Sequence, residues 1–154
     1  MATATDLEAV EVRVAEVRPV RSQPDHTLFA AVLSEVVGTR AWAVVMRKPE
    51  ADNLVMHLRG TRTERPMTCT FMAELVRALG GRVLEARVTA ADDKTIYANV
   101  TFEGLNGRQV VDARPSDALN LALRTGAAIR VAHEPLKNLQ QVDTGSGAPP
   151  IEWL

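Results

Sequence analysis

Apolar and polar positions alternate at the start of the chain. Within residues 8–20, three successive valines at alternate positions are separated by charged residues. This period of two is typical of a strand with one buried face. Residues 28–37 and the apolar run 41–46 predict two more strands, with a break at Gly38-Thr39. We therefore expect three strands before the first helix.

A helical period replaces the alternation in residues 49–58, 68–79 and 116–124. Apolar residues three and four positions apart share one face of a helix. Pro49 suits the first turn of the first helix, and Gly80-Gly81 ends the second. The second helix carries the clearest apolar stripe, which we expect to belong to the core: Phe71, Met72, Leu75, Val76 and Leu79.

Three alternating segments joined by short turns, residues 82–89, 95–103 and 108–113, follow the second helix. Short connections predict an antiparallel meander. One more strand is expected over 128–132, after the third helix. Runs of strands interrupted by helices indicate the α+β class. We expect a single domain with a mixed, largely antiparallel sheet packed with two or three helices.

The length of 154 residues suits one domain with its own core. Residues 144–150 are rich in Gly, Ser and Pro, a composition typical of flexible linkers. We therefore expect the domain to span residues 1–142 and a flexible C-terminal tail to span 143–154.

Composition narrows the possible functions. The net charge is −1, so a nucleic-acid site would need a local basic patch. The single cysteine, Cys69, excludes an intrachain disulfide. The first residues lack the features of a signal peptide, and no apolar stretch approaches the ~18 residues of a membrane span. We expect a cytoplasmic protein without a membrane partner.

The segment from Asp112 to Asp117 links a predicted strand to the third helix and has a complete structural interpretation. Pro115 fixes the turn, and Ser116 is expected to cap the helix. Arg114 then pairs with Asp112 or Asp117, and Asp117 also complements the helix dipole. In this interpretation the segment is an ion-paired corner.

The same residues have a functional interpretation. Free N–H groups at a helix start suit a phosphate, and Arg114 adds a bidentate contact to phosphate oxygens. Asp112 and Asp117 would hold Mg²⁺ or Mn²⁺ or act as a general base. The residue types alone leave the structural and the functional interpretation open.

A similar device, Arg65-Pro66-Met67-Thr68, precedes the second helix, where Thr68 is the expected N-cap. If both helix starts face one cleft, Arg65 and Arg114 form a local basic patch. We then expect four residues to contact the substrate: Arg65, Thr68, Arg114 and Ser116.

Other chemistry is weakly represented in the sequence. The three histidines, His26, His57 and His133, have no metal-ligand spacing. Cys69 lies in the first turn of a helix with no histidine near it in sequence, so we expect a buried, unreactive thiol. There is no phosphate-binding loop of the GxxxxGK[ST] type and no paired CxxC motif.

The motifs together resemble one family. Asp112-Ala-Arg-Pro-Ser-Asp-Ala-Leu119 and the following Leu121-Ala-Leu-Arg124 match the hallmark of the bifunctional nuclease family. The Arg65–Thr68 segment is similar to its second motif, and Glu50-Ala51 to the pair that opens an earlier helix. The resemblance covers roughly residues 10–139. It implies an α+β domain with a large mixed sheet, self-association, and activity on DNA and RNA.

The chain departs from the family pattern in two places, so it resembles a divergent member. The second motif usually continues with His-Asp, where this chain has Cys69 and Thr70. If that pair supplies acid–base or metal-binding groups, they are lost here. Residues 41–49 also lack the family's usual Leu-Pro-Ile and Ile-Gly pattern.

Two hypotheses follow. The first is a nuclease that hydrolyses phosphodiester bonds of DNA or RNA, with Asp112 and Asp117 as base or as ligands of Mg²⁺ or Mn²⁺. The second is a catalytically inactive family member that binds nucleic acid or protein and self-associates as a homo-oligomer. The sequence does not identify a set of metal ligands.

Overall fold

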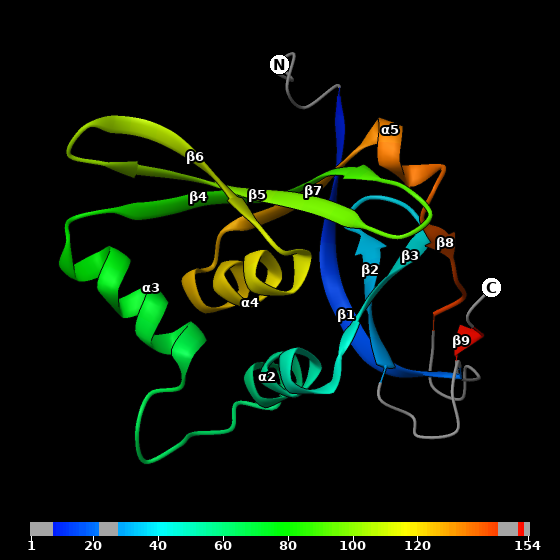
Figure 1. Cartoon of the computed structure of the whole chain (residues 1–154), viewed down its shortest axis with the longest axis horizontal. Helices are drawn as coiled ribbons and strands as arrows, with labels where there is room; N and C mark the ends of the chain where they lie inside the picture. Colours follow the sequence, from blue (N-terminus) through cyan, green and yellow to red (C-terminus); the bar gives the residue numbers. More distant parts are fainter. Residues whose placement is uncertain (1–7, 22–27, 145–150, 153–154) are drawn as a thin grey trace.

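The strands of the domain form one nine-stranded mixed sheet in the part of the chain described by the computed structural model, residues 8–21, 28–144 and 151–152 (Figure 1). In chain order they are β1 (Ala9–Arg21), β2 (Leu28–Glu35), β3 (Ala41–Arg47), β4 (Arg82–Ala91), β5 (Ile96–Gly104), β6 (Gly107–Ala113), β7 (Ala128–Ala132), β8 (Gln140–Gln141) and β9 (Ile151–Glu152). The helices are α2 (Lys48–Leu58), α3 (Thr68–Ala78), α4 (Pro115–Thr125) and the short α5 (His133–Leu136).

The strand order is β6-β5-β4-β7-β1-β2-β3-β8, with β9 beside β1. The β4–β7 and β1–β9 pairs are parallel, and the other pairs are antiparallel. The expected α+β class, the largely antiparallel sheet and the meander β4-β5-β6 are therefore confirmed. Of the expected tail, residues 145–150 and 153–154 lie outside the described residues.

A bulge in β1 divides the strand between two apolar clusters. The register with β2 shifts between Val14 and Glu16. Before the shift, Val12 and Val14 face the main core beneath the helices. After it, Val20 lies in a second cluster with residues of β2 and β3. Because side chains alternate along a strand, one extra residue reverses which of them face the helices.

The helix α4 is the centre of the main core. Six of its residues are buried, among them Leu119 at 1% exposure and Ala122 at 0%. It packs against α2, α3 and the strands β4, β5 and β7. Figure 1 shows all three long helices on the same side of the sheet. The segment from Asp112 to Arg124 therefore contains the helix that packs at the centre of the domain.

The apolar stripe of α3 belongs to the core only in part: Met72 and Val76 pack against the main cluster, and the expectation was wrong for the other three residues. Phe71, Leu75 and Leu79 are 56%, 45% and 68% exposed, while Met72 and Val76 are only partly buried. Periodicity identifies residues that share a helix face, but it does not say what covers that face. Here α3 packs mainly on α4 and makes little contact with the sheet.

The expected side-chain caps were also wrong. The N-cap residues are Met67 for α3 and Arg114 for α4, and neither helix start has a side-chain cap hydrogen bond. The helix α4 begins at Pro115, which places Ser116 inside the first turn. A proline at the first helical position is favourable because its missing N–H would lack a helical partner anyway.

Candidate functional site

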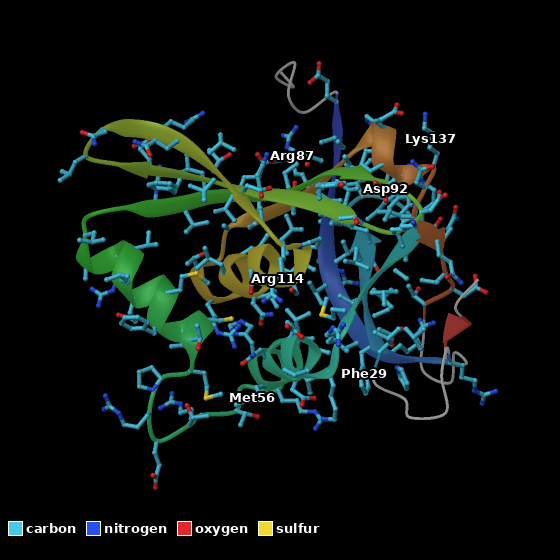
Figure 2. The ribbon with its side chains drawn as sticks, viewed as in Figure 1. Phe29, Met56, Arg87, Asp92, Arg114 and Lys137 are labelled. Carbon is cyan, nitrogen blue, oxygen red and sulfur yellow. The ribbon has the colours of Figure 1, made fainter. Side chains whose placement is uncertain are left out.

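The corner before α4 is organised around the guanidinium of Arg114. Its Nε donates to Oδ2 of Asp117 at 2.7 Å, and its Nη2 donates to Oδ1 at 3.1 Å. Its Nη1 donates to Oε1 of Glu50, which comes from α2, at 3.1 Å. Figure 2 shows Arg114 between α4 and α2. Of the two expected partners, the structure pairs Arg114 with Asp117.

The carboxylates beside Arg114 hold its charge in place. The hydrogen bonds and charge of Asp117, followed by those of Glu50, raise the pKa of Arg114 above its usual value. The Arg114 side chain is nevertheless 65% exposed, so part of it faces solvent. Oε2 of Glu50 is buried and has no hydrogen-bond partner among the described residues. The corner thus combines a fixed cation with one carboxylate oxygen whose hydrogen-bonding capacity is unused.

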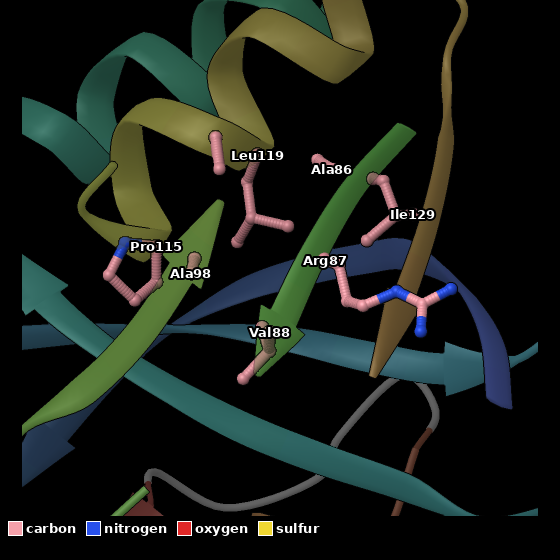
Figure 3. A pocket seen from close by; sticks show the side chains of 8 residues that line it. Ala86, Arg87, Val88, Ala98, Pro115, Leu119 and Ile129 are labelled. Atoms are coloured by element: carbon pink, nitrogen blue, oxygen red, sulfur yellow. The ribbon is translucent and has the colours of Figure 1, made fainter. Parts of the chain in front are cut away.

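The buried face of α4 fixes the position of this corner. Pro115 and Leu119 point toward β4 and β5, where Val88 and Ala98 complete a packed apolar layer (Figure 3). The remaining gap there is too small for a water molecule. Close packing of this kind leaves side chains little freedom to move. The backbone that carries Arg114 and Asp117 is therefore held by the core.

A second polar network joins the three long helices. The buried side chain of Asn120 donates to the carbonyl oxygens of Ser116 and Glu50 at 2.9 and 3.3 Å. Arg124 donates to Oδ1 of Asn120 at 2.9 Å, to the carbonyl of Asn53 at 3.1 Å and to Oγ1 of Thr70 at 3.1 Å. These bonds link α4 to α2 and α3, so Asn120 and Arg124 position the site.

The starts of α3 and α4 meet at one cavity. Its volume is about 470 Å³, and Thr68 and Asp117 both line it. Its other walls come mainly from apolar residues of α3, α4 and the meander: Met72, Val76, Val83, Val100, Phe102, Val111, Ala113 and Leu121. The two Arg-Pro segments, far apart in sequence, therefore lead to helix starts that share one space.

Asp112 borders the same cavity, but β6 orients it differently from Asp117. In the register of β6 with β5, Val111 lies opposite Val100 and Asp112 lies opposite Asn99. Side chains alternate between the two faces of a strand. Val111 lines the cavity, so this alternation puts the Asp112 carboxylate on the opposite face of the sheet.

The other two expected substrate contacts lie in different environments. Arg65 is exposed in the segment that precedes α3. Ser116 is buried at 6% exposure in the first turn of α4. Its hydroxyl is thus largely removed from solvent, whereas its backbone N–H belongs to the turn whose amides lack helical partners.

Cys69 is the only buried residue of α3. Burial raises the pKa of its thiol, and the nearby charges of Arg124, Asp117 and Arg114 act in opposing directions. The expectation of a buried thiol is confirmed. On α2, burial and the charge of Arg124 lower the pKa of His57. His26 lies outside the described residues.

No preformed metal centre is found in the described part of the chain, where no three His, Cys, Asp or Glu side chains are grouped to hold an ion. Both carboxylate oxygens of Asp117 already accept hydrogen bonds from Arg114. Among the described helices, none has the length and apolar character needed to cross a membrane.

Sequence reasoning missed the roles of Glu50, Asn120 and Arg124. In the sequence Glu50 stands out only as part of a Glu-Ala pair, and the other two lie within the segment that marks the third helix. Arg124 bonds to Thr70, at the position where the family pattern has the Asp of its His-Asp pair. Asn120 and Arg124 lie four residues apart on α4, and this spacing is the one local signal that they share a role.

The fold and this corner define a single α+β domain in which three helices cover one side of a mixed sheet. The family model of the bifunctional nuclease domain matches residues 31–143. The chain belongs to the bifunctional nuclease domain family. Two proteins from two strains of Mycobacterium tuberculosis are each 33% identical to it over 122 residues, covering 79% of this chain and 70% of each relative. Both relatives are described as uncharacterized proteins.

Proposed function

We propose that this protein acts on the phosphodiester backbone of DNA or RNA at the cavity between the starts of α3 and α4. The observation that carries the proposal is that Thr68 and Asp117, from the first turns of two helices, line one cavity. Free backbone N–H groups and the positive dipole end of a helix favour a phosphate. Two such starts at one cavity add their effects.

In this proposal Arg114 and Arg65 contact phosphate oxygens. Arg114 is held by Asp117 and Glu50, and its exposed part is available for an additional acceptor. Thr68 offers a hydroxyl at the cavity, and Ser116 offers its first-turn N–H. The apolar wall that includes Phe102 provides a surface for a nucleobase.

Asp117 is the proposed general base. Its carboxylate would accept the proton of an attacking water, whose oxygen forms the new bond to phosphorus as the leaving oxygen departs. Asp112 is the second carboxylate of the proposal: it lies on the outer face of the edge strand β6 and would reach a substrate that extends past this edge of the cavity. We derive no step through Mg²⁺ or Mn²⁺, because the described residues do not gather a ligand set for either ion.

The test is cleavage of labelled single- and double-stranded DNA and RNA in Mg²⁺, Mn²⁺ or EDTA. We expect cleavage by the purified protein and its loss in the Asp112→Asn, Asp117→Asn double variant. Asp93→Asn, an exposed carboxylate in the β4–β5 turn, is the matched control. Cleavage that persists unchanged in the double variant would identify a contaminating nuclease and contradict the proposed site.

Binding is tested separately from cleavage. Charge reversal at Arg65 and Arg114 is expected to abolish binding of a single-stranded oligonucleotide, because each would replace a phosphate contact with repulsion. Arg65→Glu alone is the safer variant for folding, since its side chain is exposed. Arg13→Glu, on the exposed side of β1, is the control. Unchanged binding in both reversed variants contradicts the phosphate site.

A second candidate function is a catalytically inactive module that binds nucleic acid or a protein partner. The observation that favours it is that Cys69 and Thr70 occupy the positions of the family's His-Asp pair, with Cys69 buried and Thr70 bound to Arg124. Binding without cleavage in any metal would support this function. We also propose a cytoplasmic location and self-association as a homo-oligomer.

A further inference from the structure

A second cavity, of about 650 Å³, lies between the β4–β5 turn, the strands β2 and β3, and the segment that leads into β8. Figure 1 shows the turn reaching across toward β3 and β8. Apolar side chains from elements far apart in the sequence form much of its wall: Leu28, Val45, Ile96, Pro115 and Leu139. A mostly apolar wall with a few polar groups is typical of sites for small planar ligands.

The turn that closes this second cavity is held by hydrogen bonds within the chain. Oδ1 of Asp92 accepts from the backbone N–H of Lys94 at 2.9 Å and from that of Thr95 at 2.8 Å. Nδ2 of Asn138 donates to the carbonyl oxygen of Ala91 at 2.7 Å, which ties the turn to the segment before β8. The polar groups of the turn are therefore held at the mouth of the cavity.

The free polar groups of the second cavity suit a hydrogen-bond donor that carries no negative charge. Both bonds to the Asp92 side chain go to Oδ1, so Oδ2 has no hydrogen-bond partner among the described residues. The same bonds hold the pKa of Asp92 below its usual value, so its carboxylate is ionised at neutral pH. Asp93 adds a second carboxylate, and Lys94 is the one cation among the described lining residues. This balance of charge disfavours a phosphate inside the cavity.

The Arg114 corner borders the second cavity as well as the cavity between the helix starts. Asp117 lines the cavity between the helix starts, whereas Pro115, directly after Arg114, lines the second one. A nucleic-acid strand with a phosphate at Arg114 carries one base on each side of that phosphate. Phe102 offers a surface to one of these bases. The second cavity is placed to take the other.

We propose that the second cavity binds the base next to the phosphate at Arg114 and selects a base whose exocyclic amino group adjoins an unprotonated ring nitrogen, as in adenine and cytosine. The proposal rests on the proposed function and deepens it. The amino group donates to Oδ2 of Asp92, and the ring nitrogen accepts from the ammonium of Lys94. Thymine and uracil present a carbonyl and a ring N–H instead, so both contacts are lost. The apolar wall contacts the faces of the ring.

Binding of two fluorescently labelled pentanucleotides to the full chain in EDTA tests this selectivity. One consists of five deoxyuridines, and the other has deoxycytidine at its centre, which exchanges a carbonyl and a ring N–H for an amino group and a bare ring nitrogen. Fluorescence anisotropy should show about tenfold tighter binding of the strand with cytosine. Equal affinities overturn this proposal and leave the phosphate site intact. If neither strand binds, the proposed function fails and this proposal fails with it.

The substitution Asp92→Asn tests the one atom on which the selectivity depends. Its amide oxygen still accepts the N–H groups of Lys94 and Thr95, which keeps the turn, but an NH₂ donor takes the place of Oδ2. We expect the two pentanucleotides to bind this variant with similar affinity. Asp93→Asn removes the same charge from the neighbouring residue, which makes no proposed contact with the base, and should keep the preference for cytosine. A preference that survives Asp92→Asn overturns the proposal.

Amide NMR locates the bound base. With ¹⁵N-labelled protein, the strand with cytosine should shift the amides of Ile96 and Gln140, which come from two different sides of the second cavity. The amides around Arg13 should stay unchanged. If the strand binds and neither Ile96 nor Gln140 shifts, the base lies elsewhere and the proposal is overturned.

Discussion

The helices α3 and α4 begin alike and are used differently. An Arg-Pro pair stands at the start of each, just before α3 and across the first residue of α4, and each helix has eleven residues. Six residues of α4 are buried, whereas α3 buries only Cys69. The difference comes from their neighbours: α4 lies between two helices and over the sheet, and α3 lies at the margin of the helical layer.

The two helices have different roles at the site: α4 holds the Arg114 corner in place, and α3 forms a wall of the cavity that stays open to solvent. The side chains of Asn120 and Arg124 connect α4 to both neighbouring helices and fix the corner at Arg114. The helix α3 instead supplies an open wall of the cavity and keeps large apolar side chains in solvent. A similar local motif therefore sets where a helix starts, while tertiary contacts decide what the helix does.

The largest expected difference is in core packing. Leu119→Ala, in α4, should lower the free energy of unfolding by about 2–5 kcal/mol, because it leaves a cavity in a closely packed layer. Leu75→Ala, in α3, makes the same chemical change at a side chain that is 45% exposed, so its cost should be below about 1 kcal/mol. Urea unfolding at low protein concentration measures both. Equal losses would contradict the division between the helices.

A smaller loss is expected when the connection between helices is cut. Arg124→Ala removes bonds to Thr70, Asn120 and the Asn53 carbonyl and should cost about 2 kcal/mol. Arg77→Ala, which removes only an exposed pair with Glu74 on α3, should change stability by about 0.5 kcal/mol or less. Thermal and urea unfolding report both values. If the two variants lose the same stability, Arg124 does not join the helices as described.

The smallest expected effect concerns the inner side of α3. Burial raises the pKa of the Cys69 thiol, so near pH 8 the reactive thiolate is scarcer than in the unfolded chain. Alkylation by iodoacetamide should be about tenfold slower, or more, in the native protein than in urea. Mass spectrometry over time measures the two rates. Native labelling as fast as in urea would show that α3 does not bury this thiol.

The sequence predicted those parts of the fold that depend on neighbouring residues. The strand over 128–132 agrees with the structure, and α4 begins one residue before the expected position, because alternation and Pro115 act locally. The ion pair between Arg114 and Asp117 was one of two expected pairings, since three positions along a helix bring side chains together.

Long-range contacts explain what the sequence did not predict. Glu50 is 64 positions from Arg114, and no local period relates them. Arg124 reaches Thr70 and Asn53 across 54 and 71 positions. The exposed part of the α3 stripe is a similar case. The helical period correctly identifies a shared face, but no other described element covers Phe71, Leu75 and Leu79 on that face. Sequence patterns thus described each helix but not the cavity between them.

The central claim is that the starts of α3 and α4 form one phosphate-binding cavity, and amide NMR tests it most directly. A single-stranded oligonucleotide would be titrated into ¹⁵N-labelled protein in EDTA, to slow cleavage by any metal-dependent nuclease. We predict that amides of the non-proline residues within 65–70 and 112–118 shift together with one affinity, while those around Arg13 stay unchanged. Shifts at only one helix start, shifts confined to another part of the domain, or no shifts would contradict the claim.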